Sequence, residues 1–316
     1  MRIALAQINP TVGDLAGNSG RIVARAREAA QKGASVVVFP ELSLTGYPPR
    51  DLVEKPSFIE ASEAALARLA RETASLELAI ICGYVAHSHA ETGKHAFNSA
   101  AVIERGDVIF KQSKMLLPTY DVFDEGRYFR PSERESLFTL GKVPVALTIC
   151  EDAWNDRQFW KQRLYQRDPV EELFAAGGQV LISINASPYN MGKRAVRREI
   201  FSSMAKRYGK PVVYVNQVGG NDQLVFDGSS FALNAEGQAI ASACSFAEDL
   251  AICDLDTGTG DKHENFADEC EASYEALVLG TRDYIRKCGF SRVLIGLSGG
   301  VDSSLVAAIA VEAVGK

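Results

Sequence analysis

The sequence predicts an α/β fold, because apolar runs of strand length alternate with amphipathic helical segments along the chain. A second observation points to one edge of the predicted sheet. The apolar run 36–40 stops at Glu41, the run 108–110 stops just before the segment leading to Lys114, and the run 143–149 stops at Cys150. Crevices at the carboxyl ends of neighbouring strands commonly hold the chemistry of such proteins. We therefore expect a Glu, a Lys and a Cys to meet there.

Composition narrows the class of protein. The 316 residues are 47% hydrophobic and 23% charged, as in ordinary globular proteins, and the net charge of −6 gives no basic field for nucleic acid or an anionic membrane. No stretch has the length of a membrane span, and the first strand-like residues lack the apolar segment of a signal peptide, which predicts a cytoplasmic protein. The six cysteines form no CxxC pair, which argues against structural zinc or a disulfide framework; five are expected to be plain buried residues.

The first half of the chain is expected to open with a β-α-β unit. The run 3–8 predicts a strand, and the segment 18–32 has apolar residues at helical spacing up to Gly33. The next expected elements are a helix over 57–74 and strands over 78–84, 97–104 and 108–111, with a turn signal at Arg105-Gly-Asp107. The stretch 112–131 is long and irregular, and such loops in compact domains are usually functional.

In the second half, β-α alternation resumes after the strand that ends at Cys150. Hydrophobic spacing and turn signals predict a helix over 158–176, a strand over 179–184, a helix over 193–208, a strand over 211–216 and several short strands over 224–253. The Gly- and Asp-containing stretch 256–262 then predicts a linker. We accordingly expect two domains, 1–258 and 259–316.

The last segment predicts an anion-binding turn. A helix is expected over 271–287 and a strand over 292–297, and the turn 298–304 leads into a helix over 305–314. Unpaired N–H groups and the positive end of a helix bind phosphate or pyrophosphate. Two glycines alone would indicate only a tight turn, but the flanking serines and Asp302 favour a functional loop.

Several motifs carry a resemblance to known families. Ser298-Gly-Gly-Val-Asp-Ser303 resembles the pyrophosphate-binding loop of the N-type ATP pyrophosphatases, and Glu41, Lys114 and Cys150 resemble the catalytic set of the nitrilase superfamily. Amidase first and pyrophosphatase second is the order of the glutamine-dependent NAD+ synthetase family. Further local matches are Gly46-Tyr-Pro-Pro-Arg-Asp-Leu52, the stretch 114–129, Cys150-Glu-Asp152, Val215-Asn-Gln-Val-Gly-Gly220 and Leu224-Val-Phe-Asp-Gly228.

The resemblance implies a fold and an assembly. It implies a nitrilase-like αββα sandwich, followed by the first strand and helices of an incomplete Rossmann-like α/β domain. It also implies a homo-oligomer, at least a dimer. The family's pyrophosphatase domain continues far beyond its ATP loop, whereas this chain stops at Lys316. We therefore expect the chain as given to support only the glutaminase half-reaction.

The resemblance also implies roles for individual residues. Glu41 would take the thiol proton of Cys150, and Lys114 with the backbone N–H of Glu151 would hold the oxyanion of a glutamyl thioester pathway. Supporting and glutamine-binding roles are implied for Glu125, Tyr120, Ser187 and Arg194. No cofactor is needed for glutamine hydrolysis.

For the complete enzyme, the resemblance implies ATP, Mg²⁺ and deamido-NAD as further reactants. The ATP-binding residues would be Ser298, Gly299, Gly300, Asp302, Ser303 and Ser304, with Asp302 also helping to hold the metal. Nucleic acid and membrane are not expected as partners.

Two alternatives stand beside this interpretation. A stand-alone carbon–nitrogen hydrolase would share Glu41, Lys114 and Cys150 but has no reason to carry the loop at Ser298. A catalytically inactive fragment is the other class, since taken singly a strand-end Cys is more often packing, a loop Lys is usually solvated, and a Glu after a proline can sit in a turn. Labelling of Cys150 by a glutamine-analogue electrophile separates the two classes.

Overall fold

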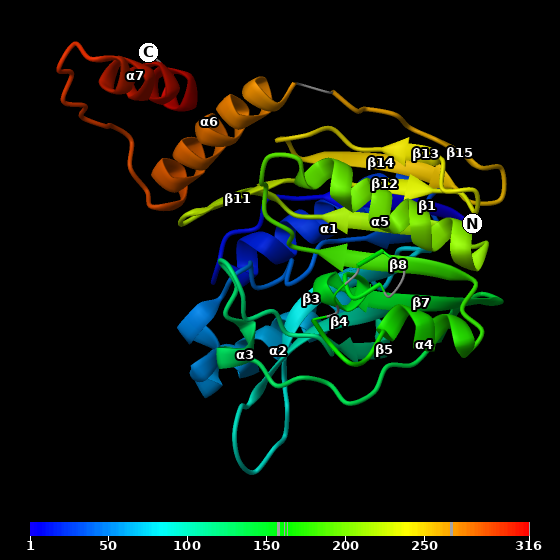
Figure 1. The fold of residues 1–316 in the computed structure, drawn as a ribbon. Coiled ribbons are helices and arrows are strands. Elements are labelled where there is room, and N and C mark those ends of the chain that lie inside the picture. Colours follow the sequence, from blue (N-terminus) through cyan, green and yellow to red (C-terminus); the bar gives the residue numbers. More distant parts are fainter. Residues whose placement is uncertain (157–158, 161, 163, 266–267, 316) are drawn as a thin grey trace.

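The computed structural model describes residues 1–156, 159–160, 162, 164–265 and 268–315, and its main body contains two stacked β-sheets (Figure 1). The first has the strand order β15-β14-β1-β2-β3-β4-β5 and the second the order β13-β12-β9-β8-β7-β6. The strands of the first sheet are β1 (Arg2–Gln7), β2 (Val36–Val38), β3 (Ala79–His87), β4 (Ala96–Glu104), β5 (Asp107–Ser113), β14 (Asp249–Asp254) and β15 (Thr259–Gly260). Those of the second are β6 (Phe138–Leu140), β7 (Val143–Ile149), β8 (Val180–Asn185), β9 (Val212–Asn216), β12 (Phe231–Leu233) and β13 (Ala239–Ser242).

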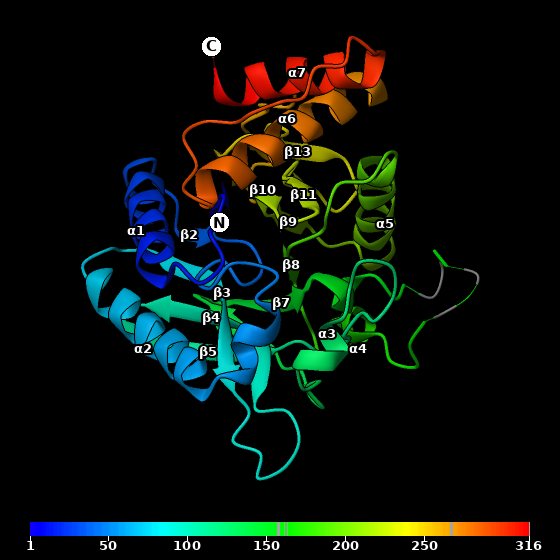
Figure 2. The ribbon, with the colours of Figure 1, turned by 90° about the vertical axis from the view of Figure 1, so that its left-hand side faces the viewer.

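Helices cover both outer faces of this pair of sheets. Figure 2 shows four layers, with α1 (Leu15–Gln31) and α2 (Pro56–Glu72) on one side and α4 (Pro169–Ala175) and α5 (Lys193–Tyr208) on the other. Short turns of helix lie at η1 (Arg50–Glu54), α3 (Glu125–Tyr128) and η2 (Cys150–Ala153). This confirms the expected αββα sandwich.

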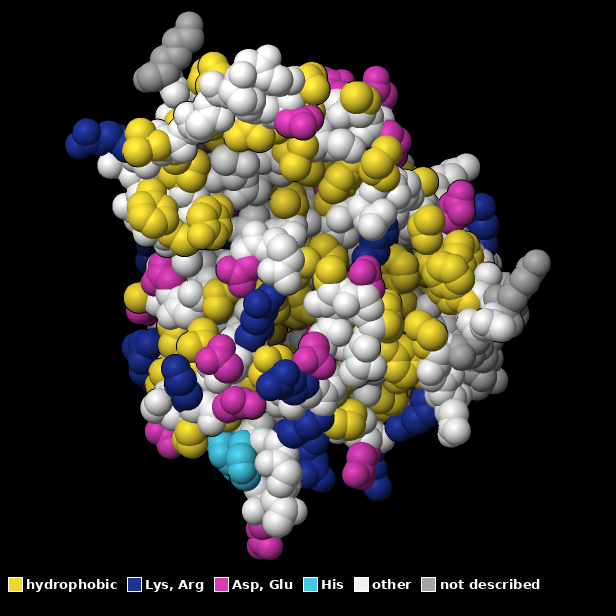
Figure 3. Space-filling model, turned by 60° about the vertical axis from the view of Figure 1, so that its left-hand side comes forward, with side chains coloured by type: hydrophobic (Ala, Val, Ile, Leu, Met, Phe, Trp, Pro, Cys, Tyr) yellow, Lys and Arg dark blue, Asp and Glu magenta, His cyan; other side chains and the backbone are white. Residues whose placement is uncertain are grey.

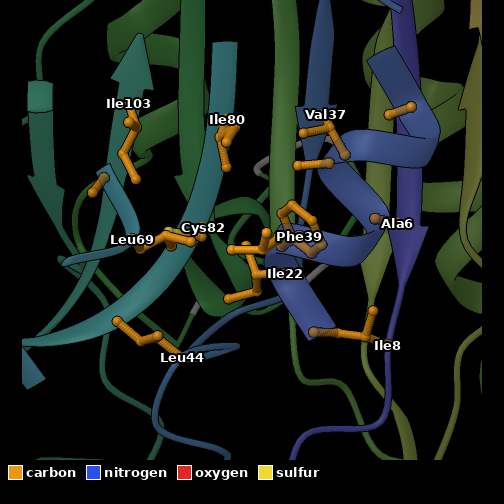
Figure 4. Packing of buried hydrophobic residues seen from close by; sticks show 14 of the residues in the cluster. Ala6, Ile8, Ile22, Val37, Phe39, Leu44, Leu69, Ile80, Cys82 and Ile103 are labelled. Atoms are coloured by element: carbon orange, nitrogen blue, oxygen red, sulfur yellow. The ribbon is translucent and has the colours of Figure 1, made fainter. Parts of the chain in front are cut away.

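The alternation of side chains along the strands builds three apolar layers. On β7, Val145, Leu147 and Ile149 face the space between the sheets, whereas Ala146 packs toward α4 and α5. On the other side, residues such as Ile22 of α1, Leu69 of α2 and Ile80 of β3 form the outer layer shown in Figure 4. A strand with both faces buried needs apolar residues at every position, which explains the continuous apolar runs in the sequence.

The direction of the strands determines where the candidate site residues lie. β2 is parallel to β3, and β7 is parallel to β8, so the carboxyl ends of each pair lie at one edge. β5 follows two antiparallel steps from β3 through β4, and two reversals restore the direction of β3. The residues that follow β2, β5 and β7 therefore emerge at one end of the sandwich, as the sequence predicts.

The helix predicted over 158–176 is wrong in its first half. Among the described residues of that range, only Pro169–Ala175 is helical, and residues 157–158, 161 and 163 lie outside the described part of the chain. Asp168 caps the helix by accepting a hydrogen bond from the Glu171 N–H, and Pro169 occupies the first position, where its missing N–H costs nothing. The Asp-Pro pair is thus a start signal inside what looks like one continuous helix.

The C-terminal segment forms two helices that stand away from the sandwich, α6 (Glu269–Lys287) and α7 (Val301–Val314) (Figure 1). α6 packs on a small hairpin of β10 (Val218–Asn221) and β11 (Leu224–Asp227), and α7 packs on α6 through Val278 and Ile309. The strand predicted over 292–297 is wrong, since those residues pair with no strand in the described chain and Leu294 is fully exposed. An extended segment forms a strand only beside a partner, and no other strand lies next to it here.

Part of the segment expected to be a linker belongs to the first sheet. Thr259–Gly260 pairs with β14, and the Asp261 N–H donates to the carbonyl of Ile252. The division at 258 stays a prediction. The next part of the chain is anchored by charge: the Asp283 carboxylate of α6 accepts the Gly220 N–H at 2.7 Å, and Lys287 donates to the side chain of Asn9 at 2.7 Å.

Figure 3 shows hydrophobic side chains exposed across the upper part of one face, where α6 and α7 lie. The exposed apolar residues of this segment include Leu277, Tyr284, Phe290, Val293, Leu294, Ile295, Leu297, Val301, Leu305, Val306, Val311 and Val314.

Two further expectations concern the burial of the cysteines and membrane-spanning segments. Cys82, Cys150 and Cys253 are buried, but Cys270 and Cys288 are exposed, so the expectation of five buried cysteines is wrong. In the part of the chain that the structure describes, no helix is long and apolar enough to cross a membrane.

We predict that amide hydrogen exchange divides this segment in two. In the described chain, residues 288–300 form no strand hydrogen bonds, and the apolar cluster that holds α7 consists of residues of α6 and α7. The amides of 288–300 and α7 should therefore exchange far faster than those of β7 and β8. α6 should be protected to an intermediate degree because Asp283 and Lys287 tie it to the sandwich. Mass-spectrometric exchange measures this directly, and equal protection of α7 and β7 would contradict it.

Candidate active site

A buried lysine between two carboxylates forms the floor of the site. Lys114 directly follows β5, and its Nζ donates to Oε1 of Glu41 at 2.7 Å and to Oε1 of Glu125 at 2.8 Å. All three side chains are buried. Burial alone would lower the pKa of Lys114, but the Glu125 and Glu41 carboxylates outweigh it and raise that pKa well above the usual value. Lys114 is therefore a permanent cation.

Two further residues, Asn98 and Tyr47, hold these carboxylates, and neither was predicted as a site residue. Asn98 on β4 donates through Nδ2 to Glu41 at 2.7 Å and to Glu125 at 3.2 Å, and the Tyr47 hydroxyl donates to Glu125 at 2.8 Å. Glu41 also accepts the backbone N–H of Ala186 at 2.9 Å. Asn98 lies beside Ser99 in a strand that is otherwise apolar up to its last residue, and this polar pair is the signal that could have drawn attention to it.

Glu41 reaches this place because the chain after β2 lies tightly against β3. A Cβ on Gly83 would come within 2.0 Å of the Leu42 nitrogen, and the Leu44 N–H donates to the Gly83 carbonyl at 3.0 Å. Only glycine lets the two backbones approach this closely. The glycine in β3 therefore sets the position of the carboxylate on the neighbouring segment.

Cys150 stands at the end of β7 in a backbone conformation that side chains rarely adopt, with φ of +48°. Such strain persists only where the surrounding structure fixes it, and it is frequent at active sites. Burial raises the pKa of the Cys150 thiol well above its usual range, and the Glu41 carboxylate adds to the rise, while Lys114 opposes it. The Glu41 and Glu125 carboxylates lie against the Lys114 ammonium group and offset its positive charge near the thiol.

A cavity of about 370 Å³ opens onto Cys150. It is lined by Tyr120, Phe123, Cys150, Glu151, Trp154, Asn155, Trp160, Gln162, Leu164, Tyr165, Ser187 and Lys193. The Tyr120 hydroxyl donates to Glu151 at 2.9 Å, and the Ser187 hydroxyl is buried without a hydrogen-bond partner among the described residues. Tyr120, Glu151 and Ser187 thus lie in the cavity, as expected from the sequence.

Arg194 is not brought to this cavity. Its Nη1 donates to the Ser245 hydroxyl at 3.1 Å, on the far side of α5, whereas the preceding residue, Lys193, lines the cavity. Adjacent positions on a helix point about 100° apart, so only one of the two can face Cys150. Lys193 lies over the rings of Trp154 and Phe123, 5.5 and 5.6 Å from their centroids, and burial lowers its pKa.

The loop predicted to bind ATP lies at the start of α7 (Figure 1), and none of its residues is among those that line this cavity. Gly299 has φ of +86°, Gly300 caps the helix, and Asp302, Ser303 and Ser304 lie in its first turn. The hydroxyls of Ser303 and Ser304 donate to the Gly300 carbonyl, and Ser298 contacts Ser303 at 3.1 Å. Within the described residues, no group of three His, Cys, Asp or Glu side chains is suited to a metal ion.

Comparison with known proteins shows the family to which the chain belongs. Residues 2–262 match the model of the carbon–nitrogen hydrolase family, and residues 273–316 match that of NAD synthase. The chain belongs to the carbon–nitrogen hydrolase family. This carbon–nitrogen hydrolase is similar to a glutamine-dependent NAD+ synthetase from Synechocystis sp., with 48% identity over 99% of the chain and 58% of the relative.

Solved structures agree with that assignment. A glutamine-dependent NAD+ synthetase from Acinetobacter baumannii, solved with ADP, superposes with a TM-score of 0.86 at 35% identity, over 99% of this chain and 57% of that one. An amidase from Nesterenkonia sp. superposes with a TM-score of 0.67 over 81% of this chain and 93% of its own, and at 23% identity it shows the shared fold. This hydrolase thus spans somewhat more than half the length of the synthetases it resembles.

Proposed function

We propose that this chain is the glutaminase portion of a glutamine-dependent NAD+ synthetase, a carbon–nitrogen ligase that takes ammonia from glutamine to amidate deamido-NAD with ATP. One observation carries the proposal. The similarity to synthetases runs through the hydrolase region and on through residues 273–316, which match NAD synthase. A stand-alone amidase would not need residues 273–316. We propose the division into domains at 1–258 and 259–316 on the same ground.

The geometry supports a thioester mechanism. The raised pKa of Cys150 keeps the thiol protonated, so a base must remove the proton during attack on the glutamine side-chain amide. We assign that role to Glu41, which would pass the proton to the departing ammonia. Lys114 has three N–H donors, and Glu41 and Glu125 take two of them. The third, with the backbone N–H of Glu151, is assigned to the oxyanion.

The cavity also offers partners for the rest of a glutamine molecule. We assign the α-carboxylate to Lys193, in place of Arg194, because Lys193 is a desolvated cation in the cavity. Glu151, held by Tyr120, is the carboxylate available to an α-ammonium group. The Ser187 hydroxyl, which has no hydrogen-bond partner among the described residues, can accept from the α-ammonium group or donate to the α-carboxylate. A pocket lined by one cation and one anion favours an amino acid over a simple amide.

A matched pair of variants tests this assignment. Lys193→Met should raise the KM for glutamine about 10- to 100-fold with a smaller change in kcat, because a charge-assisted hydrogen bond to substrate is lost. Arg194→Met, one residue away but facing Ser245, should leave KM unchanged. Ammonia release is followed in a coupled assay. A KM effect on Arg194→Met and none on Lys193→Met would overturn the assignment.

The turn 298–304 suits the phosphate part of ATP. The backbone N–H groups that begin α7, with Gly299 and Gly300, suit a phosphate, and we propose Ser298, Asp302, Ser303 and Ser304 as its neighbours. Asp302 would help to hold Mg²⁺, which would offset the negative charge of the phosphates. Oligomerisation stays a prediction from the resemblance, and a cytoplasmic location stays a prediction from the sequence.

A further inference from the structure

A single carboxylate behind the site joins the two chain segments that deliver Lys114 and Cys150. Oδ1 of Asp152 accepts the backbone N–H groups of Met115 at 3.0 Å and Leu116 at 2.8 Å, and Oδ2 accepts that of Ile149 at 3.2 Å. Met115 follows Lys114 directly, and Ile149 precedes Cys150. Because β5 and β7 belong to different sheets, these hydrogen bonds of Asp152 link the two sheets next to the site. We call this set of hydrogen bonds the clasp.

A second carboxyl group lies against this clasp. Glu135 belongs to the segment before β6, and both of its carboxyl oxygens are buried without a hydrogen-bond donor among the described residues. Its neighbour is the Asp152 carboxylate, which interacts with it by charge and by a side-chain hydrogen bond. Two carboxyl groups that meet out of water cannot both be ionised, and a hydrogen bond between them requires one proton.

The environment decides which group carries the proton. Asp152 accepts three backbone N–H bonds, and such bonds favour the ionised form, whereas Glu135 accepts none. Burial raises the pKa of Glu135, and the Asp152 carboxylate and the more distant Glu172 raise it further, while Arg167 opposes this. Arg167 is itself engaged with Glu172 at the surface. Burial also raises the pKa of Asp152, to about 7, but its backbone hydrogen bonds and Lys114 oppose the rise, and that pKa stays below the value of about 10 for Glu135.

We propose that Glu135 is protonated and donates to Asp152, and that this proton-sharing pair positions the segments carrying Lys114 and Cys150. Both are positioning residues, because neither lines the cavity that opens onto Cys150. The effect on turnover rests on the proposed function, but the protonation of Glu135 does not. Loss of the proton would place two carboxylates face to face and open the clasp.

The sign of the pH effect follows from the raised pKa. The pair is intact at neutral pH, where an exposed glutamate would be ionised, and it is lost as the pH rises through the raised pKa of Glu135. Activity should therefore have an alkaline limit set by this group. The amide of Glu135→Gln keeps a donor toward Asp152 and cannot ionise, so this variant should keep kcat within about threefold and lose that limit. Glu135→Leu has no donor and should lower kcat about 10- to 100-fold with little change in KM, as expected for a small misplacement of reacting groups.

Infrared difference spectroscopy tests protonation without turnover. At neutral pH, the wild-type minus Glu135→Gln spectrum should contain the C=O stretch of a protonated carboxylic acid, shifted in D2O. Glu133→Gln, two residues away and exposed, is the matched control and should remove no such band. Absence of the band, or a Glu135→Leu variant that folds and keeps the wild-type kcat and pH profile, overturns the proposal. If the wild-type chain released no ammonia from glutamine, the proposed function would fail while the band still decided the protonation of Glu135.

Discussion

Replacing Cys150 with alanine should abolish ammonia release from glutamine, by about 10⁴-fold or more, while the fold survives. The Cys150 thiol lines the cavity at the end of β7 and is the assigned nucleophile, so without it no thioester can form. The side chain is small and almost fully buried, so its loss should cost on the order of 1 kcal/mol of the free energy of unfolding. A coupled ammonia assay and thermal unfolding measure the two quantities.

Two controls sharpen this result. Cys82→Ala removes an equally buried sulfur from the outer layer of the core and should leave hydrolysis unchanged. A glutamine-analogue electrophile should label Cys150 in preference to the exposed Cys270 and Cys288, and mass spectrometry identifies the site. Glutaminase activity that persisted in Cys150→Ala would refute the assignment of the nucleophile, and labelling confined to the exposed cysteines would favour an inactive fragment.

Replacing Lys114 with methionine should both inactivate the chain and destabilise it by about 3–5 kcal/mol. Methionine has a similar length but no charge, so the Glu41 and Glu125 carboxylates would be left buried against each other without a cation. The raised pKa of Lys114 means that its stabilising effect is complete at neutral pH and is lost only as the pH rises through that raised value. Denaturant unfolding of the two proteins at neutral pH gives the difference.

A double variant separates stability from catalysis. Glu125→Gln combined with Lys114→Met removes one of the two facing charges and should recover part of the lost stability, because the two sites are in contact and their effects are not additive. Activity should not return, since no cation remains for the oxyanion. An unfolding free energy of Lys114→Met equal to that of the wild type would contradict the buried ion arrangement.

The strand ends were the most predictable part of this molecule. Alternation of apolar residues predicts β7 at its observed bounds, and the acid, lysine and cysteine that follow three strands meet because strand direction fixes which ends share an edge. The helix at Lys193–Tyr208 also matches its prediction residue for residue, since Gly192 and Gly209 bound it. These features depend on local sequence, where spacing and turn chemistry decide the outcome.

Other features depend on contacts between distant segments. Asn98 and Tyr47 look ordinary in sequence, and only the fold brings them within hydrogen-bonding distance of Glu125. The choice between Lys193 and Arg194 depends on the rotation of α5 about its axis, which a change of one residue in register reverses. The unpaired segment 292–297 has the composition of a strand, and pairing depends on a neighbour rather than on composition.

The buried Lys114 between two carboxylates has a consequence for the product of the proposed reaction. The amide nitrogen leaves with the one proton that Glu41 took from the thiol. A second proton would have to come from Lys114, whose hold on its own protons is strengthened by Glu125 and Glu41. The nitrogen is therefore released uncharged, as ammonia rather than ammonium. It departs with its lone pair free, which is the form that can attack an activated carboxyl group.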